Sequence, residues 1–419
     1  MLQTQQEERL EASQGSGHRI LIISPWENRW SLGGGAGVSD DFNFIRNFTR
    51  AGYELHFLSP KSDTAADFRV DGFHTHTYPN FFKPTLSWPT SIRRILWPTL
   101  YNAIVPAYAV QLSRRIRPDF VLGHSHFSAL ASYMTREFLQ IPSGVKLFGV
   151  MDLVHTEWPR WKYNFKNLEQ ILALKVPQDV WIILDDGTKG DEAALRHGVP
   201  ESKIRFLPNG INVDWMSAPS ESAALRDEFG LDRDSYVVLF LARLVASKRP
   251  ELLLQAVPEI TKRVDKPVHF VFAGDGEERE RLEALTRAMG IGDNVRFLGA
   301  VPHARVPDIM SVSDVFVSTS RLTNVAIPTC EALVCGLPVV AMDIGNTSDI
   351  IKDGETGRLV GDGDVEGLSA AIAELLEDPA ARSEMGRRAR ELAKARFTGW
   401  EARTHMEMKI IDQIIAARS

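Results

Sequence analysis

Arg243 and Lys248 stand close together in the segment FLARLVASKRP, where their side chains could bind a diphosphate. A guanidinium can fork onto two phosphate oxygens, and an ammonium adds a compact positive charge. Because the segment begins as an apolar run, both residues are expected at the end of a strand and in the loop after it. The alternative for each residue is an ordinary solvated position on the surface.

Glu331 stands in the segment STSRLTNVAIPTCEALVCGLPVV, 318–340, which places small and polar residues between two apolar strands. Pro328 suits the first position of a helix, which puts Ile327 at the N-cap, where it has no side-chain oxygen. The first N–H groups of that helix are therefore left free for an external acceptor. Glu331 lies one turn into the helix, where a carboxylate also interacts well with the helix dipole, but no capping box can form. A hydroxyl group of a ligand is a candidate partner for it.

A glycine-rich loop, SLGGGAGVSDDF, follows the first apolar run of the chain. Its glycines are Gly33, Gly34, Gly35 and Gly37. Glycine lets the backbone approach a ligand, and the helix expected after the loop offers free N–H groups, so phosphate is the candidate ligand. The spacing does not match the dinucleotide fingerprint G-x-G-x-x-G, and a merely flexible loop is the alternative.

Two further groups of polar residues follow apolar runs in the first half of the chain. His124 and His126 end the run PDFVLGHSH, and Asp152 and His155 follow in GVMDLVHTEW. We expect them in facing loops at one edge of a sheet, although a lone histidine is more often a satisfied surface or core residue. Their spacing does not match a metal triad of histidines and carboxylates, so no catalytic metal is expected.

The elements that must position these residues are short apolar runs, which alternate with longer segments of helical period. This alternation predicts crossover units and parallel sheets, with ligand-binding loops at the carboxyl ends of the strands. The first series of expected strands comprises 18–25, 53–60, 118–126, 146–152, 180–186 and 203–210. The second series comprises 235–244, 269–276, 294–301, 315–320 and 337–343. The sequence thus predicts an α/β protein with two doubly wound, Rossmann-like domains.

The length of the chain, 419 residues, also predicts two domains of roughly 200 residues each, because a single core rarely grows that large. The polar segment 210–234 is the best candidate for the connection between them. The predicted divisions are a disordered tail, a first domain, a second domain and a C-terminal helix, at 1–18, 19–208, 209–397 and 398–419. The last helix either caps the second domain or bends at FTGW, 397–400, and packs back on the first.

The composition is that of an ordinary globular protein, with 44% hydrophobic and 24% charged residues, and the formal net charge of −6 argues against nucleic acid as the main partner. The two cysteines, Cys330 and Cys335, fit a reducing compartment and provide no disulfide framework or zinc cluster. The N-terminus does not resemble a secretory signal, and no apolar run is long enough to span a membrane. We expect a soluble cytoplasmic protein, or one peripheral to the inner face of a membrane.

Taken together, the motifs of the chain resemble those of the retaining, nucleotide-sugar-dependent glycosyltransferases of family 4. They are GGGAG, GHSHFSAL, PNGIN, ARLVASK, FAGDGEERERL, TCEALVCGLPVVAMDIG and DGETGRLV. The resemblance runs from about residue 19 to the C-terminus and is strongest over 235–360. It implies the GT-B fold, in which an acceptor domain and a nucleotide-sugar donor domain face a central cleft. It also implies transfer of a sugar from a nucleoside-diphosphate sugar to a glycan or lipid-linked acceptor, with retention at the anomeric carbon and with neither cofactor nor metal.

The resemblance further implies roles for individual residues. Arg243 and Lys248 would hold the donor diphosphate and stabilise its charge in catalysis, and Glu331 would bind the ribose hydroxyls. His124 would be the active-site histidine beside the donor sugar. The other donor-binding residues would be Gly34, Gly35, Asn324, Val325, Ala326 and Ile327, through close backbone approach and free N–H groups. We expect His126, Asp152 and His155 on the acceptor side.

The sequence departs from the family pattern where a first glutamate usually grips the donor sugar. Thr323 stands there, eight positions before Glu331, and Asn324-Val325-Ala326 replaces the usual Gly-Phe-Gly. A hydroxyl cannot supply the charge-assisted hydrogen bonds of a carboxylate, so the identity of the donor sugar does not carry over. Two other functions stay open, namely an epimerase or phosphorylase on the same fold and a non-catalytic sugar-nucleotide-binding subunit. Retention of Glu331 and the two cations favours the transferase over the binding subunit.

Segment 81–118 is a basic exception in an acidic chain, since it contains no Asp or Glu. Its basic residues are Lys83, Arg93, Arg94, Arg114, Arg115 and Arg117, and its aromatic residues include Phe81, Phe82, Trp88, Trp97 and Tyr101. Such a segment could lie on an anionic membrane surface and admit a lipid-linked acceptor. The alternative is a core helix with a solvated basic face.

Overall fold

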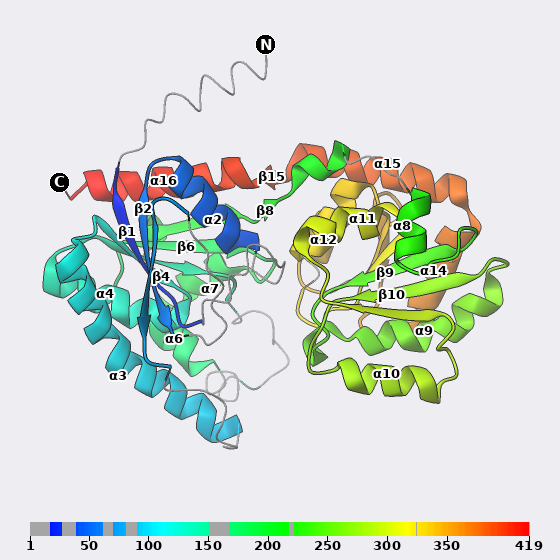
Figure 1. Ribbon diagram of the computed structural model, residues 1–419, viewed down its shortest axis with the longest axis horizontal. Helices are drawn as coiled ribbons and strands as arrows, with labels where there is room; N and C mark the ends of the chain where they lie inside the picture. Colours follow the sequence, from blue (N-terminus) through cyan, green and yellow to red (C-terminus); the bar gives the residue numbers. More distant parts are fainter. Residues whose placement is uncertain are drawn as a thin grey trace, which may run out of the picture.

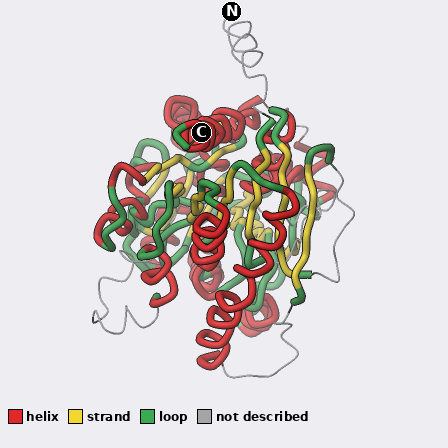
Figure 2. Tube along the Cα trace, turned by 90° about the vertical axis from the view of Figure 1, so that its left-hand side faces the viewer, coloured by secondary structure: helices red, strands yellow, loops and turns green. Residues whose placement is uncertain are grey.

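The structure is a computed structural model, and it describes residues 17–26, 39–61, 70–80, 90–150, 159, 167–217, 222–323 and 325–418. Two α/β domains lie side by side along the long axis of the molecule, and the C-terminal helix runs back over the first domain (Figure 1). Figure 2, which looks along that axis, shows strands with helices on either side. Of the predicted tail 1–18, all but the last two residues lie outside the described ranges.

The first domain is built on a seven-stranded parallel sheet with the strand order β3-β2-β1-β4-β5-β6-β7. The strands are β1 (Arg19–Ile23), β2 (Glu54–Pro60), β3 (Phe73–Tyr78), β4 (Phe120–His124), β5 (Ser143–Leu147), β6 (Val180–Asp185) and β7 (Ile204–Pro208). Its helices include α2 (Ser39–Arg50), α3 (Thr90–Ile116), α4 (Ala129–Leu139), α6 (Leu168–Leu174) and α7 (Gly190–Arg196). Alternate residues of β1 serve opposite cores, since Ile20 and Ile22 pack with α2, whereas Leu21 and Ile23 pack with α3.

The second domain is built on a six-stranded parallel sheet with the order β11-β10-β9-β12-β13-β14. The strands are β9 (Tyr236–Leu241), β10 (Val268–Ala273), β11 (Val295–Gly299), β12 (Val315–Ser318), β13 (Val339–Met342) and β14 (Gly357–Val360). The helices are α8 (Ser222–Glu228), α9 (Pro250–Arg263), α10 (Arg279–Ala288), α11 (Val306–Ser311), α12 (Ile327–Cys335), α13 (Thr347–Ile350), α14 (Val365–Glu377) and α15 (Pro379–Arg396). Both faces of β9 are covered, with Val238 and Phe240 in one core and Val237 and Leu239 in the other. Such two-sided burial explains why the strand reads as a continuous apolar run.

The predicted strands all have counterparts, but the sequence missed one edge strand in each sheet. These strands are β3 and β14, and β5 begins at Ser143 rather than at 146. The segment expected to connect the domains, 210–234, belongs mostly to the second domain, because Trp215, Leu225 and Phe229 pack against its core. The connection itself is therefore much shorter than the polar composition suggested.

The chain crosses between the domains twice, and the two crossing segments pair with each other. Strand β8 (Gly210–Ile211) runs parallel to β15 (Thr398–Gly399), and α16 (Trp400–Ala416) follows β15 directly. A Cβ on Gly210 would lie only 2.1 Å from the ring of Trp400, so only glycine permits this close approach. From there α16 packs on the first domain, where Thr404 Oγ1 accepts a hydrogen bond from Asn47 Nδ2 at 2.9 Å.

No helix of the described residues is long and apolar enough to cross a membrane. In α3, Tyr101, Val105 and Ala109 are buried in the core, whereas Arg114 and Arg115 near its end are exposed. This pattern fits a core helix with a solvated basic end, and the membrane-surface alternative for 81–118 stays a prediction. Residues 81–89 and the side chains of 90–95 lie outside the described part of the chain.

Candidate active site

The two domains meet where loops follow the carboxyl ends of β6 and β12. Gly187, after β6, adopts φ +81°, and a Cβ on it would lie 2.5 Å from Thr323 Oγ1 and 2.8 Å from Val325. The loop of the first domain therefore touches the loop of the second that leads into α12. Burial and Arg243 lower the pKa of Lys248 in the second domain, and Asp186 is close enough to offset part of this lowering. Loops at the carboxyl ends of parallel strands are where ligands bind in such sheets.

Arg243 is positioned by the close approach of the segments that follow β9 and β10. Leu244 N–H donates to the Asp275 carbonyl at 3.0 Å, next to the arginine. Gly274 has φ +144°, and a Cβ on it would lie 1.9 Å from the Ala242 carbonyl oxygen, so the approach requires glycine. The side chain of Arg243 is exposed, and no acidic side chain among the described residues forms an ion pair with it.

Lys248 lies at the end of a short 3-10 helix, Ala246–Lys248, which the segment after β12 fixes. Its carbonyl accepts a hydrogen bond from Thr319 Oγ1 at 2.8 Å, and the Ser247 carbonyl accepts one from Arg321 N–H at 2.9 Å. Burial lowers the pKa of Lys248, and the like charge of Arg243 lowers it further. Within the described residues this ammonium has no ion-pair partner. The arrangement is therefore suited to an anion supplied from outside.

Helix α12 begins at Ile327, so its N-cap is Ala326 and not Ile327 as predicted from the position of Pro328. The prediction of an uncapped start holds, because alanine has no side-chain oxygen and no side chain caps the helix. One predicted donor is occupied, since Val325 N–H donates to Thr323 Oγ1 at 3.0 Å. Asn324 lies outside the described residues. The N–H groups at the start of α12 are the donors that helix geometry leaves without intrahelical partners.

Glu331 is buried on α12, with only 2% of its surface exposed. Its Oε1 accepts a hydrogen bond from Asn212 Nδ2 at 2.7 Å and lies 3.4 Å from His303 Nε2. Trp215 packs beside His303, with 5.1 Å between the ring centroids. The sequence alone assigned no role to Asn212 of the PNGIN motif, and it did not indicate His303. Both hold Glu331 in place from distant parts of the chain.

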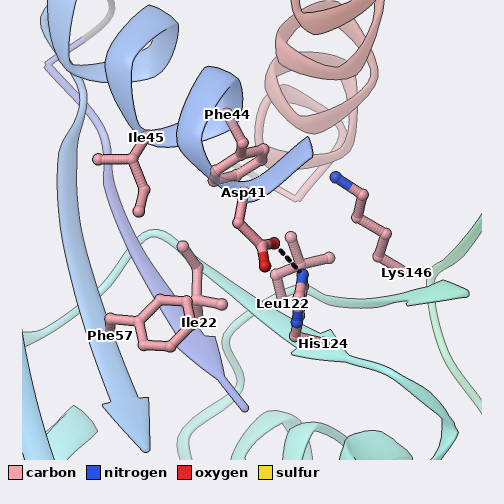
Figure 3. A pocket seen from close by; sticks show the side chains of 8 residues that line it. All are labelled: Ile22, Asp41, Phe44, Ile45, Phe57, Leu122, His124 and Lys146. Carbon is pink, nitrogen blue, oxygen red and sulfur yellow. Dashed lines mark ion pairs between the residues drawn. The ribbon is translucent and has the colours of Figure 1, made fainter. Parts of the chain in front are cut away.

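His124 ends β4 inside the first domain, where its Nε2 lies 2.7 Å from Asp41 Oδ1 on α2. Both side chains are buried, and Figure 3 shows them pointing toward each other. The ring meets Phe148 edge-on, with centroids 4.6 Å apart, and among the described residues its Nδ1 has no hydrogen-bond partner. A cavity beside it has about 10 Å³ of room for the centre of a water molecule, roughly enough for one. Sequence reasoning found this histidine but not its carboxylate.

Ser125, between the two strand-end histidines, has an unusual backbone conformation with φ +90° and ψ 163°. Residues other than glycine are strained in this region, and such strain persists mainly where the surroundings impose it, often at functional sites. His126 follows this turn, and burial lowers its pKa to about 4. At neutral pH the His126 ring is therefore uncharged.

A group of buried charged residues attaches α16 to the first domain near His124, and the sequence did not predict this group. Lys146 Nζ lies 2.5 Å from Asp40 Oδ2 and 3.3 Å from Glu407 Oε1, and Arg403 contacts both Asp40 and Glu407. Burial opposes the charge of Asp40, but Lys146 and Arg403 outweigh burial and hold its pKa below the ordinary value. The C-terminal helix thus contacts the residue next to Asp41.

Asp40, Asp41 and His124 lie near enough to one another for one metal ion to reach all three. Two observations argue against a metal there. Asp40 already has two buried cations, Lys146 and Arg403, as partners. All three side chains of the candidate group are also buried, so none of them is exposed to an ion from solvent. Gly34, Gly35, Asp152 and His155, also expected in the site, lie outside the described residues.

The fold is shared with solved structures that have two parallel-sheet α/β domains, the GT-B fold. Sucrose-phosphate synthase from Thermosynechococcus elongatus matches with a TM-score of 0.76 and 22% identity, over 96% of this chain and 100% of that one. HepE from Anabaena in complex with UDP-glucose matches with a TM-score of 0.66 and 18% identity, over 96% and 98% of the chains. The GT-B fold expected from the motifs is confirmed.

Two family models match the two domains in turn. Residues 42–215 match the model described as Glycosyltransferase Family 4, and residues 221–392 match the model described as Glycosyl transferases group 1. Together they cover most of both domains. The chain belongs to the glycosyltransferases of family 4, as the resemblance of its motifs indicated.

Similar curated proteins are themselves named as glycosyltransferases. The α-D-kanosaminyltransferase of Streptomyces kanamyceticus is 31% identical over 210 residues, which are 50% of this chain and 54% of that protein. The GDP-mannose-dependent α-(1-6)-phosphatidylinositol monomannoside mannosyltransferase of Mycolicibacterium smegmatis is 31% identical over 213 residues, 49% of this chain and 54% of that protein. The chain spans about half the length of the curated relatives it matches.

Proposed function

We propose that this chain is a retaining glycosyltransferase that moves a sugar from a nucleoside-diphosphate sugar to a glycan or lipid-linked acceptor, without a cofactor or a catalytic metal. The observation that carries the proposal is the pair Arg243 and Lys248, which lies at the carboxyl edge of the second sheet without acidic ion-pair partners among the described residues. A fixed cationic pair of this kind has no evident structural use and is suited to a diphosphate. One relative is named as dependent on GDP-mannose, and HepE was solved with UDP-glucose, which supports a nucleotide sugar as donor.

The chemistry follows from where charge develops when the sugar leaves the diphosphate. The leaving nucleoside diphosphate gains negative charge, which preorganised cations and N–H groups stabilise most effectively where water is excluded. Arg243 can hold two oxygens, Lys248 can neutralise a third, and the uncapped start of α12 adds N–H groups at its positive end. These groups could supply the positive charge that a metal ion supplies in other enzymes.

The other residues would orient the donor. Asn212 fixes Glu331, whose carboxylate has further lone pairs to accept hydrogen bonds from the ribose hydroxyls. Asp41 fixes the ring of His124 through Nε2, and the buried Nδ1, which has no hydrogen-bond partner among the described residues, would gain one if the donor sugar enters beside the ring. The acceptor would approach from the loops of the first domain. The relative named for phosphatidylinositol monomannoside supports a lipid acceptor.

Alanine substitution of the two cations tests the proposal. We expect Arg243→Ala and Lys248→Ala each to lower turnover at least about a hundredfold, because each removes one group that stabilises charge in the transition state. The measurement is release of nucleoside diphosphate from the nucleotide sugar, with folding checked by circular dichroism. Lys262→Ala is the matched control, since Lys262 is an exposed lysine paired with Glu259. Unchanged turnover in both active-site variants would exclude the proposed role.

The donor must be identified first. A thermal-shift screen over nucleoside diphosphates and their sugar conjugates is suitable, because a ligand at about one hundred times its Kd stabilises the fold by roughly 2.7 kcal/mol. Stabilisation without release of nucleoside diphosphate, with or without acceptors, would indicate a non-catalytic binding subunit. Interconversion of sugar nucleotides in the absence of any acceptor would indicate an epimerase.

A further inference from the structure

A second cluster of chemically active side chains lies in the first domain, away from the cleft. Glu54 and His56 are on β2, and His74 and His76 are on the edge strand β3. His56 is directly paired with His74 in the parallel register. Residues two apart on a strand share a face, so all four side chains lie on the same face of the sheet. The cluster lies in the first part of both strands, whereas the candidate active site lies beyond the carboxyl ends of the strands.

The distances within this cluster suit a metal ion. Glu54 Oε1 lies 3.1 Å from His56 Nε2 and 3.4 Å from His74 Nε2, and one ligand atom from each of the three residues lies within 4.8 Å of the others. Tetrahedral zinc binds nitrogen and oxygen ligands at about 2.0–2.2 Å, which places neighbouring ligand atoms roughly 3.4 Å apart. The separations from Glu54 Oε1 to the two histidine nitrogens are therefore already close to those that one ion requires.

Other residues hold the ligands in position and leave one side open. His56 Nδ1 lies 3.0 Å from His76 Nε2, and Arg19 Nε donates to Glu54 Oε2 at 2.8 Å, so Oε1 of that carboxylate is directed to the histidines. Such partners behind the ligands fix tautomers and orientation at metal sites. The side chain of His74 is 49% exposed and that of Glu54 is 38% exposed, which provides a path for an ion and a free fourth position.

We propose that Glu54, His56 and His74 bind one divalent transition-metal ion of the zinc class, with His76 orienting His56 from behind. Two imidazoles and a carboxylate prefer zinc, copper or nickel, whereas magnesium and calcium prefer oxygen ligands alone. An ion bound there would join the edge strand β3 to β2. This site is independent of the proposed glycosyl transfer, because none of its residues lies at the carboxyl edge of the sheet.

The competing arrangement is a hydrogen-bond network without metal, which predicts that the chain does not bind zinc. Arg115 Nη2 lies 3.5 Å from His76 Nδ1. The hydrogen bonds could therefore all be donated in one direction, from Arg115 to His76, from His76 to His56 and from His56 to Glu54. In that case His56 Nε2 carries a proton and cannot bind an ion. Metal binding requires both histidines to change tautomer, so that His56 Nδ1–H donates to His76 Nε2. Removal of His76 should therefore weaken metal binding but not abolish it.

Zinc binding by the untagged full-length chain tests the proposal. We expect one Zn²⁺ per chain in equilibrium dialysis, and a tetrahedral absorption spectrum when Co²⁺ replaces it. His74→Ala and His56→Ala should each weaken zinc binding at least about a hundredfold, and His76→Ala about 10–100-fold, as expected for a residue behind the ligands. His405→Ala, at an exposed histidine on α16, should retain wild-type affinity. Excess Mg²⁺ should not compete.

The outcomes are distinguishable from misfolding and from the proposed enzymatic function. His74 is exposed, so His74→Ala should keep the wild-type circular dichroism spectrum even if the more buried His56→Ala does not. Failure of the wild-type chain to bind stoichiometric zinc, or zinc binding that His74→Ala leaves unchanged, would overturn the proposal. Release of nucleoside diphosphate should continue in His74→Ala, because the variant does not alter the cleft.

Discussion

Replacing Glu407 by glutamine tests whether buried charges fasten the C-terminal helix to the first domain. The side chain of Glu407 is fully buried, contacts Arg403 and lies 3.3 Å from Lys146 Nζ. Asp40 is the other carboxylate in this group, so glutamine would leave two buried cations with a single anion. Removal of one partner from a buried ion pair typically costs about 3–5 kcal/mol, because the remaining charge stays buried without compensation.

This cost should appear as a lower melting temperature of the first domain. For a domain of about 150–250 residues, 1 kcal/mol corresponds to roughly 2–4 °C, so Glu407→Gln should lower the transition by roughly 6–20 °C. Differential scanning calorimetry measures this shift, and hydrogen exchange shows whether α16 opens first. Glu401→Gln is the matched control, since Glu401 is exposed on the same helix and should change stability by no more than about 0.5 kcal/mol.

A double variant separates charge from packing. Arg403→Met together with Glu407→Leu removes one cation and one anion, and leaves Lys146 paired with Asp40. Replacement of a buried ion pair by apolar residues of similar volume is often neutral, so the double variant should melt near the wild-type temperature. If Glu407→Gln melts like the wild type, the charges do not fasten the helix and the reasoning is refuted. If the double variant loses as much as the single one, packing rather than charge is responsible.

Other features of the fold can be tested by single substitutions. Gly187→Ala should lower turnover, because its Cβ would push the two domains apart. Gly230→Ala is the control, since Gly230 also has a positive φ but open space around it, and this variant should remain active. Release of nucleoside diphosphate measures the turnover of both variants. Gly210→Ala should lower the melting temperature by displacing the tryptophan that begins α16, and Gly292→Ala, with open space and no strain, should not. Asp40 has a pKa lowered by the neighbouring cations despite burial, so its folded state binds fewer protons than its unfolded state. Its contribution to stability should be complete above about pH 4 and lost at lower pH, and Asp40→Asn should remove that part of the acid dependence in urea titrations.

The sequence was sufficient for the strands in the middle of each sheet and for the edge strands β7 and β11, but it missed the edge strands β3 and β14. Strand β6, VWIILD, is buried on both faces and reads as a continuous apolar run. Strand β3, FHTHTY, has one neighbour only, and its central residues are polar because much of the strand faces solvent. The polar composition of segment 210–234 predicts a connection for the same reason. Its polar residues concealed the few apolar side chains, such as Phe229, that attach it to the second core.

The same distinction applies to the candidate site. Local rules found Arg243 and Glu331, because a cation after a strand and a carboxylate in an uncapped helix are visible in a few consecutive residues. They could not find partners from distant parts of the chain, such as Asn212 for Glu331 or Glu407 for Lys146, which are 119 and 261 residues apart. Those pairings depend on how two sheets and a returning helix pack. Sequence patterns of helix or strand period do not contain that information.

Donor binding and the approach of the two domains act on the same charge at the cleft. Burial lowers the pKa of Lys248, Arg243 lowers it further, and Asp186 of the first domain raises it. Asp186 is a weak counter-charge, because burial raises its own pKa and Thr188 already donates two hydrogen bonds to it. A diphosphate between the domains would pair with both cations and remove their mutual repulsion. Binding of the donor should therefore raise the pKa of Lys248, because the diphosphate would pair with the ammonium and offset the like charge of Arg243.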